Sequence, residues 1–227
     1  MAINNTKTFW VEEAMIESWN SMRSKPLLEW EKEELLDNLA PHLRRASILA
    51  KDKRKWHDTF LAWAVVKADF EMTNKWRIEA ERYHWFQIVS SLSTMHRLSE
   101  MEMDKCFYEY VDKNIIQRMK ELQDEYKANP TRENKLKMLY SCPAWLKLQA
   151  TICTNYLQLK NMVRQRRQHQ LPEWKEFEER ASQLPYAKEL IFTWSTPFEH
   201  PFDIEEDFDN LFNNYNKWVE QNNKEKI

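Results

Sequence analysis

Residues 66–72 read Val-Lys-Ala-Asp-Phe-Glu-Met, and this short stretch decides the fold class of the chain. Apolar and charged side chains alternate at every second position, which is the period of a β-strand with one buried and one wet face. It is the one convincing strand pattern that we find in the 227 residues. The sequence therefore predicts a small sheet, on which the rest of the chain packs.

The stretch that follows the strand predicts a long helix from about Asn74 to Arg97. Its second half is apolar on nearly every side, which is typical of a helix at the centre of a domain. Gln87, Ser90 and Thr94 form a polar stripe on it, at positions i, i+3 and i+7. Hydroxyls on buried helices usually bond to carbonyls of their own helix, and the alternative is that the stripe lines a ligand pocket.

Helical patterns fill most of the remaining chain. We expect helices at 104–128, 134–140 and 145–168, and, after a loop at Leu171-Pro172, a helix through Trp174, Phe177 and Leu184. A helical segment precedes them, and we interpret the basic run 51–55 as a solvated connector. The predicted fold is α+β and mostly helical, with long central helices packed on a small sheet. We expect one domain over residues 1–227, made of a helical segment at 1–55, a core at 56–195 and an acidic tail at 196–227.

The chain contains no glycine, and this absence restricts the ligand sites that it can build. Glycine lets the backbone approach a phosphate closely, as in G-x-G-x-x-G turns and P-loops. A nucleotide or phosphate would therefore have to be held by side chains. The G-x-S-x-G nucleophile elbow is excluded for the same reason, and no H-E-x-x-H zinc motif occurs.

Charge and cysteine content narrow the class of protein further. A net charge of −2 argues against a general electrostatic affinity for nucleic acid. Cys106, Cys142 and Cys153 are scattered, which argues against a disulfide framework and a structural zinc site. The sequence shows no signal peptide and no apolar run long enough to span a membrane, so we expect a cytoplasmic protein without a membrane partner.

One face of the predicted 145–168 helix, continued past its end, carries three polar residues among apolar ones. The residues on this face are Asn155, Leu159, Met162, Arg166 and His169. The apolar members mark the face as inward, and a buried guanidinium needs an anionic partner. For Arg166 that partner is either a carboxylate of the chain or a ligand phosphate, which arginine can bind through two hydrogen bonds.

A second basic cluster, Met95-His96-Arg97, stands at the end of the predicted 74–97 helix. Basic side chains in the last turn are stabilised by the helix macrodipole, and the alternative is a contact with an anion or a flavin ring.

Together the two clusters resemble the flavin-dependent thymidylate synthases. That family has a strand, then a helix that ends in Arg-His-Arg, and far downstream an Asn, a second Asn six residues later and an Arg five beyond. Here His96-Arg97 follows the strand, and Asn155, Asn161 and Arg166 repeat the downstream spacing. Glu173-Trp174 stands near the Gln-Trp of the family, and the resemblance covers roughly residues 62–195.

The resemblance implies FAD as the cofactor, with His96, Arg97, Asn155 and Asn161 in contact with it. It also implies a homo-oligomer, because the family forms tetramers. Asn161 points away from the Asn155–Arg166 face, so it either reaches a flavin with another subunit or is an ordinary surface residue. Arg166 would contact a pyrimidine nucleotide and stabilise charge that develops as its ring is activated. The predicted substrate-binding residues are Arg166, Arg167, His169 and Gln87, where Arg167 would replace Arg166 if the helix shifts register.

Departures from the family pattern leave the activity open. Met95 replaces the first Arg of the triplet, and the segment after Arg97 lacks the Asn-Glu and Arg-Tyr pairs of the family. We consider three functions: an enzyme that methylates or otherwise modifies a pyrimidine deoxynucleotide, a nucleotide binder without catalysis, and an interaction protein, for example from a phage, that acts on a host factor. The third is suggested by the acidic, aromatic tail and by the 11 tryptophans.

Overall fold

The structure is a computed structural model, and it describes residues 1–20, 23, 25–51 and 57–193. These residues belong to one compact unit, Met1–Thr193. The expected acidic tail and most of the basic run 51–55 lie outside the described residues.

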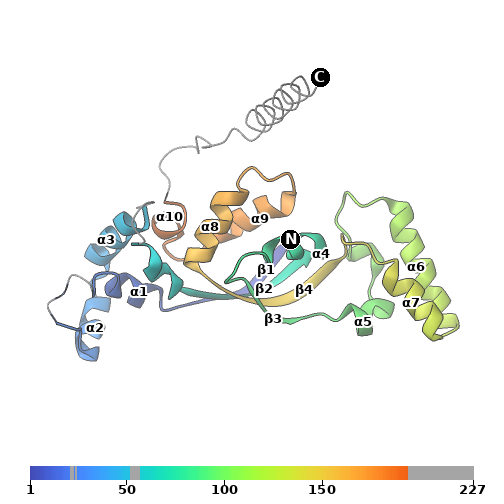
Figure 1. Cartoon of the computed structure of the whole chain (residues 1–227), viewed down its shortest axis with the longest axis horizontal. Helices are drawn as coiled ribbons and strands as arrows, with labels where there is room; N and C mark the ends of the chain where they lie inside the picture. Colours follow the sequence, from blue (N-terminus) through green and yellow to red (C-terminus); the bar gives the residue numbers. More distant parts are fainter. Residues whose placement is uncertain (21–22, 24, 52–56, 194–227) are drawn as a thin grey trace, which may run out of the picture. The chain divides into compact units, whose positions relative to one another are not determined.

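A four-stranded antiparallel sheet organises this unit, with its strands in the order β1-β2-β4-β3 (Figure 1). The strands are β1 (Ala2–Phe9), β2 (Val65–Thr73), β3 (Gln87–Ser91) and β4 (Lys147–Asn155). The predicted strand is β2, and its alternation is confirmed, because Val66, Ala68, Phe70 and Met72 are all buried. The charged residues between them face the opposite side of the sheet.

Helices make up most of the rest of the described chain. The α-helices are α1 (Val11–Glu17), α2 (Glu29–Leu36), α3 (Ala40–Lys51), α4 (Asn74–Ala80), α5 (Thr94–Arg97), α6 (Lys113–Ala128), α7 (Arg132–Tyr140), α8 (Tyr156–Arg166), α9 (Pro172–Ala181) and α10 (Ala187–Leu190). The short 3-10 helices are η2 (Thr59–Ala62), η3 (Leu98–Glu100) and η4 (Met103–Lys105). The predicted α+β, mostly helical fold is confirmed. No helix in the described ranges is both long and apolar enough to cross a membrane.

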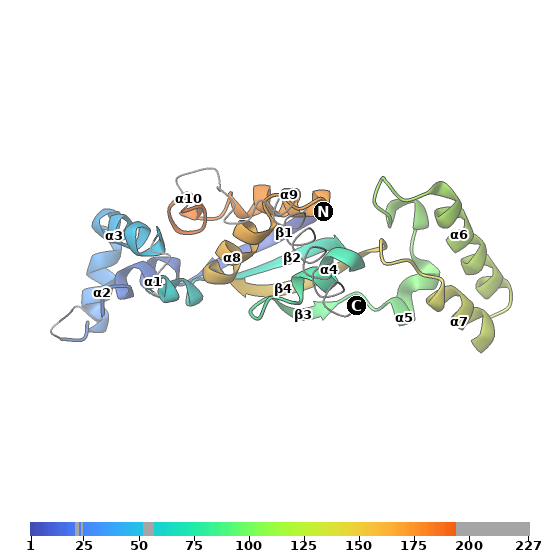
Figure 2. The same ribbon diagram turned by 45° about the horizontal axis from the view of Figure 1, so that its top comes forward.

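The helices α4, α8 and α9 pack on the buried face of the sheet (Figures 1 and 2). An aromatic cluster joins them: the rings of Trp76 and Trp174 lie 4.8 Å apart, and Phe177 lies 5.5 Å from Trp76. Phe70 of β2 stacks on Trp76 at 6.1 Å. Burying such a side chain contributes roughly 1.5–3 kcal/mol, so this cluster is a main attachment of α4 and α9 to the sheet.

Two further cores stabilise the other helices. The hairpin of α6 and α7 encloses Met119, Leu122 and Met138, together with apolar residues of the segment that follows α5. The helix α3 contacts both α1 and α10, and buried positions such as Met15 and Ala46 lie in this region. The predicted helices near α6, α7 and α9 are confirmed in most of their length.

Two predicted long helices are wrong in part. The segment 74–97 forms α4, a turn, the strand β3 and the short α5, and the first half of 145–168 forms β4. Short apolar runs do not distinguish a helix from a strand by their period alone, and pairing decides between them. Here β4 pairs with β2 without a break from Thr73↔Lys147 to Val65↔Asn155. As a result, the expected stripe of Gln87, Ser90 and Thr94 does not exist.

The N-terminal segment is not helical throughout, because β1 precedes its helices as an edge strand. Since the chain has no glycine, other residues take the left-handed backbone conformation where a turn requires it. Asn5 at a bulge of β1 has φ 50, and Trp10 and Tyr186, which precede α1 and α10, have φ 59 and φ 53. Such positions cost energy for a residue with a Cβ atom.

Candidate functional site

The end of α8 and the turn after it bring two of the predicted site residues onto one carboxylate. Arg166 Nη1 lies 3.6 Å from Oε2 of Glu79, and His169 Nε2 lies 3.2 Å from the same oxygen. Trp174 Nε1 donates a hydrogen bond to it at 3.2 Å, and Lys75 Nζ lies 3.1 Å from Oε1. The anionic partner of Arg166 in this structure is therefore a carboxylate of the chain, which is the first of the two alternatives.

Aromatic rings enclose the Arg166 guanidinium as well. It lies 5.0 Å from the ring centre of Trp174 and 5.7 Å from that of Tyr83. Its Nε donates a hydrogen bond to the Tyr83 hydroxyl at 3.0 Å, and this hydroxyl donates to Gln165 Oε1 at 3.0 Å. Contacts of this kind between a cation and an aromatic face contribute about 0.5–2 kcal/mol, so α4, α8 and α9 are joined at this point.

The hydrogen bonds of His169 assign its tautomer. Its Nδ1 accepts from the backbone N–H of Leu171 at 3.1 Å, so the proton of the neutral ring lies on Nε2 and points to Glu79. Burial lowers the pKa of His169, and the opposing effect of Glu79 does not restore it. Burial raises the pKa of Glu79, but the bonds from Trp174 and Lys75 outweigh it and hold the pKa below the ordinary value. A neutral imidazole thus faces a carboxylate.

Asn155 does not share a helix with these residues. It is the N-cap of α8, it is 5% exposed, and its Oδ1 accepts a hydrogen bond from the backbone N–H of Gln158 at 2.9 Å. The helix between Asn155 and Arg166 separates them by about 16 Å, at 1.5 Å per residue. The prediction that Asn155, Arg166 and His169 share one face is therefore only partly correct: Arg166 and His169 meet at Glu79, and Asn155 lies at the other end of α8. Asn161 is half-buried on α8.

The remaining predicted residues lie elsewhere in the fold. His96 and Arg97 are exposed on α5, and Arg97 Nη1 lies 3.2 Å from Glu100 Oε2. Gln87 is exposed on β3, and Arg167 is exposed at the end of α8. Within the described chain, no contact joins His96 or Arg97 to Glu79 or to the side chains around it, which are Lys75, Arg166, His169 and Trp174.

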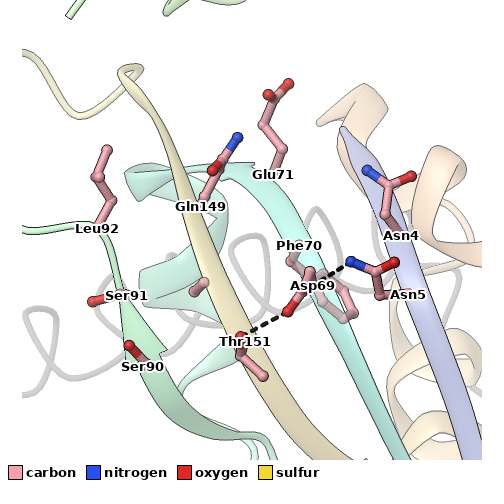
Figure 3. A pocket seen from close by; sticks show the side chains of 11 residues that line it. Asn4, Asn5, Asp69, Phe70, Glu71, Ser90, Ser91, Leu92, Gln149 and Thr151 are labelled. Atoms are coloured by element: carbon pink, nitrogen blue, oxygen red, sulfur yellow. Dashed lines mark hydrogen bonds between the residues drawn. The ribbon is translucent and has the colours of Figure 1, made fainter.

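A large cavity, of about 540 Å³, lies on the face of the sheet that the helices leave open (Figure 3). It is lined by Asn4, Asn5, Asp69, Phe70, Glu71, Ser90, Ser91, Leu92, Gln149, Ala150 and Thr151. Asp69 lies at its centre: Oδ1 accepts from Thr151 Oγ1 at 2.6 Å and Oδ2 from Asn5 Nδ2 at 2.8 Å. The Thr151 bond and then the Asn5 bond lower the pKa of Asp69, which keeps it ionised.

The lining of this cavity suits neutral polar groups rather than phosphate. Amide and hydroxyl side chains can bond to the edge of a base or to ribose hydroxyls, whereas none of the lining residues is cationic. The sequence does not reveal this cavity, because its residues come from four strands, of which only β2 is predicted from the sequence. Arg166 does not line this cavity. It also does not line two further cavities, one beside α8 and α9 and one near Thr94.

The described residues hold no group of three or more His, Cys, Asp or Glu side chains that could bind a metal ion.

Comparison with known proteins identifies the fold. No family model and no curated protein matches the sequence. Among solved structures, the flavin-dependent thymidylate synthase ThyX from Helicobacter pylori, complexed with FAD and dUMP, matches with a TM-score of 0.67 and 12% identity, over 84% of this chain and 98% of that chain. A second structure of that enzyme with FAD and dUMP gives 0.65 and 14%, over 84% and 97%. The chain thus has a fold similar to that of the flavin-dependent thymidylate synthases.

Proposed function

We propose that this chain is a nucleotide-binding protein whose ligands are FAD and a pyrimidine deoxynucleotide. The observation that carries the proposal is the extent of the likeness, because a ThyX structure with FAD and dUMP is matched over 98% of its own length. Modification of the pyrimidine ring is the finer part of the proposal, and FAD would supply the hydride chemistry for it.

Side chains that fit an anion are present on α5. The partner of Arg97 is Glu100, and both side chains are 60% exposed, so this ion pair contributes little and a phosphate can replace it. His96 lies beside it and is also exposed. These two residues would hold the diphosphate of FAD, in keeping with their predicted role.

Arg166, His169 and Asn155 would meet a ligand only at a cost. A nucleotide at Arg166 or His169 would have to replace the Glu79 carboxylate, and a flavin at Asn155 would have to replace the cap of α8. The cavity around Asp69, on the face of the sheet that the helices leave open, is an alternative binding site for the base and ribose. Its volume of about 540 Å³ is in the range of small-molecule sites. We propose that the base and ribose bind there.

Ligand titration tests the proposal. We expect the purified protein, after incubation with FAD, to retain flavin absorbance through desalting, and dUMP to raise its melting temperature. Arg97→Ala should weaken FAD binding by roughly tenfold, the loss of one charge-assisted hydrogen bond. Arg118→Ala is the matched control, because Arg118 is an exposed arginine on α6 that pairs with Glu121 and Glu125. Equal effects of the two variants would contradict the assignment of Arg97.

A second candidate function is protein interaction, and exposed aromatic side chains favour it. In the described residues, Trp63 is 69% exposed, Trp30 is 61% exposed and Trp10 is 55% exposed. Tryptophan is enriched at interface hot spots. The partner is either a second copy of this chain or another protein, and light scattering, which measures the mass in solution, distinguishes the two. A homo-oligomer that dissociates on Trp63→Ala supports self-association. A monomer that also shows no affinity for FAD or dUMP in the titration supports a foreign partner.

A further inference from the structure

The cavity around Asp69 is lined by groups that accept hydrogen bonds and carry negative charge. Asp69 and Glu71 stand two residues apart on β2, so their side chains lie on the same face of the sheet, and both line the cavity. None of the lining residues that the structure describes is cationic. Because an ionised carboxylate can only accept hydrogen bonds, the cavity favours a ligand group that donates them.

The carboxylate of Asp69 is held in place and is accessible (Figure 3). Thr151 Oγ1 donates to Oδ1 at 2.6 Å, and Asn5 Nδ2 donates to Oδ2 at 2.8 Å. A carboxylate has about four lone-pair sites, so each oxygen can accept a further hydrogen bond. Asp69 is half-buried and lines the cavity, so a ligand can reach it. Since the three side chains come from three paired strands, the carboxylate is oriented before a ligand binds.

Glu71 adds a second negative charge. Its side chain is 38% exposed, and Lys147 Nζ lies 3.9 Å from its Oε1, which is too far for a hydrogen bond. An exposed ion pair of this kind contributes little. Lys67, two residues before Asp69, is exposed, and neither lysine lines the cavity. The charge of Glu71 therefore remains available to attract a donor group.

Cytosine and uracil differ in the group that such a cavity would bind. Cytosine carries an amino group, which donates hydrogen bonds, at the position where uracil has a carbonyl oxygen. The ring N–H of uracil lies between two carbonyl oxygens, which a carboxylate repels. In DNA recognition, Asp and Glu side chains accept a hydrogen bond from the cytosine amino group. An ionised Asp69 therefore favours cytosine.

We propose that the pyrimidine bound in this cavity is cytosine rather than uracil, and that Asp69 determines this preference. The inference rests on the proposed function, because it names the base of the nucleotide proposed there. The amino group of the base donates to the Asp69 carboxylate, and Glu71 attracts it further. The phosphate stays outside, since two carboxylates and no cation line the cavity.

Equilibrium dialysis of the full chain with dCMP, dUMP and their nucleosides, deoxycytidine and deoxyuridine, tests the proposal. We expect dCMP to bind roughly tenfold more tightly than dUMP, within the discrimination that one good base contact provides. The two nucleosides should show the same ratio, because the phosphate takes no part in the preference.

A substitution at Asp69 assigns the preference to its carboxylate. Asp69→Asn should abolish it, because the amide has no charge and can donate to the uracil oxygen. Asp124→Asn is the matched control, since it removes an exposed carboxylate on α6 and should leave the ratio unchanged. Methyl resonances of Leu92 and Thr151, which line the cavity, should shift on addition of deoxycytidine. If Asp69→Asn fails to fold, the comparison of ligands on the unaltered protein still decides.

Three results would overturn this inference and leave the proposed function standing. They are binding of dUMP as tight as that of dCMP or tighter, a preference that Asp69→Asn does not change, and methyl shifts that spare both Leu92 and Thr151. Absence of binding by all four compounds at millimolar concentration would contradict the proposed function as well.

Discussion

Thr73 Oγ1 donates a hydrogen bond to Glu173 Oε1 at 2.5 Å, and both residues are buried. The same hydroxyl accepts from the backbone N–H of Trp76 at 3.1 Å and so caps α4. One side chain at the end of β2 therefore orients α4 and attaches α9, and these are the helices that carry Glu79 and Trp174.

Replacing this hydroxyl tests the attachment. We expect Thr73→Val to lower the free energy of unfolding by about 2–4 kcal/mol, because it removes a helix cap and leaves the buried Glu173 carboxylate without its donor. Thr73→Ser keeps the hydroxyl and should cost about 1 kcal/mol or less. Urea unfolding monitored by tryptophan fluorescence measures both, and equal losses for the two variants would contradict the role of the hydroxyl.

The pair of Arg166 and Glu79 permits a test that separates structure from ligand binding. Arg166→Met should destabilise the fold by about 1–3 kcal/mol, because it leaves a mostly buried carboxylate with one partner fewer. In a double-mutant cycle with Glu79→Gln, we expect a coupling free energy of about 1 kcal/mol or more.

Dissociation constants for dUMP on the same variants complete that test. If Arg166 binds the nucleotide, Glu79→Gln should tighten dUMP binding, since the competing carboxylate is gone, while Arg166→Met weakens it. Unchanged dUMP affinity in both variants would assign Arg166 a structural role alone.

The pH dependence of stability follows from His169. Its pKa in the folded protein lies below the ordinary value of 6.5, so the unfolded state binds more protons between the two values. The stabilisation is present above 6.5 and is lost as the pH falls through the lower, folded pKa. His169→Gln, which keeps a donor toward Glu79, should remove this part of the pH dependence in a series of thermal melts.

His42 serves as the comparison for that series. Burial, aided by Arg45 and Arg23, lowers the pKa of His42 as well. His42→Gln should therefore also reduce the pH dependence of stability in the same acid range. If the slope of stability against pH stays the same in both single variants and in the double variant, this explanation is wrong.

Asn155 distinguishes a helix cap from a flavin contact. Asn155→Ala should cost about 1 kcal/mol through loss of the cap, and Asn155→Ser should restore most of it because serine caps equally well. If the amide also binds FAD, Asn155→Ser should still weaken FAD binding. Equilibrium dialysis with FAD, beside urea unfolding, gives both quantities, and full FAD affinity in a stable Asn155→Ser variant would exclude the contact.

The sequence was informative where one local signal sufficed. The alternation in β2 identified a strand with one wet face, and the pattern of 134–140 predicted the short helix α7. The cap of α7, where Thr131 accepts from the backbone N–H of Asn134, is a finding of the structure. The strand β4 also alternates, with Leu148 and Ile152 inward, but it continues directly into α8 at Asn155. That continuity hid the change of period, and the two halves looked like one helix.

The site was less predictable for a different reason. Glu79 meets Arg166 only because α4 and α8 pack on the same face of the sheet, and no local pattern relates residues so distant in sequence. Asn155, Asn161 and Arg166 have the predicted spacing, but α8 begins at Tyr156, between the first two of them. Asn155 is therefore the cap of the helix, and only Asn161 and Arg166 lie within it. Asp69 was visible on the wet face of β2, whereas its partners Asn5 and Thr151 lie on strands that the sequence did not reveal.

The affinity of the purified protein for FAD is the most direct test of the proposed function. After incubation with FAD and removal of the free ligand, we predict a visible flavin spectrum that Arg97→Ala diminishes and Arg118→Ala leaves intact. A colourless protein that fails to take up FAD, with a melting temperature that dUMP does not change, would contradict the proposal and leave the fold as the sole property shared with ThyX.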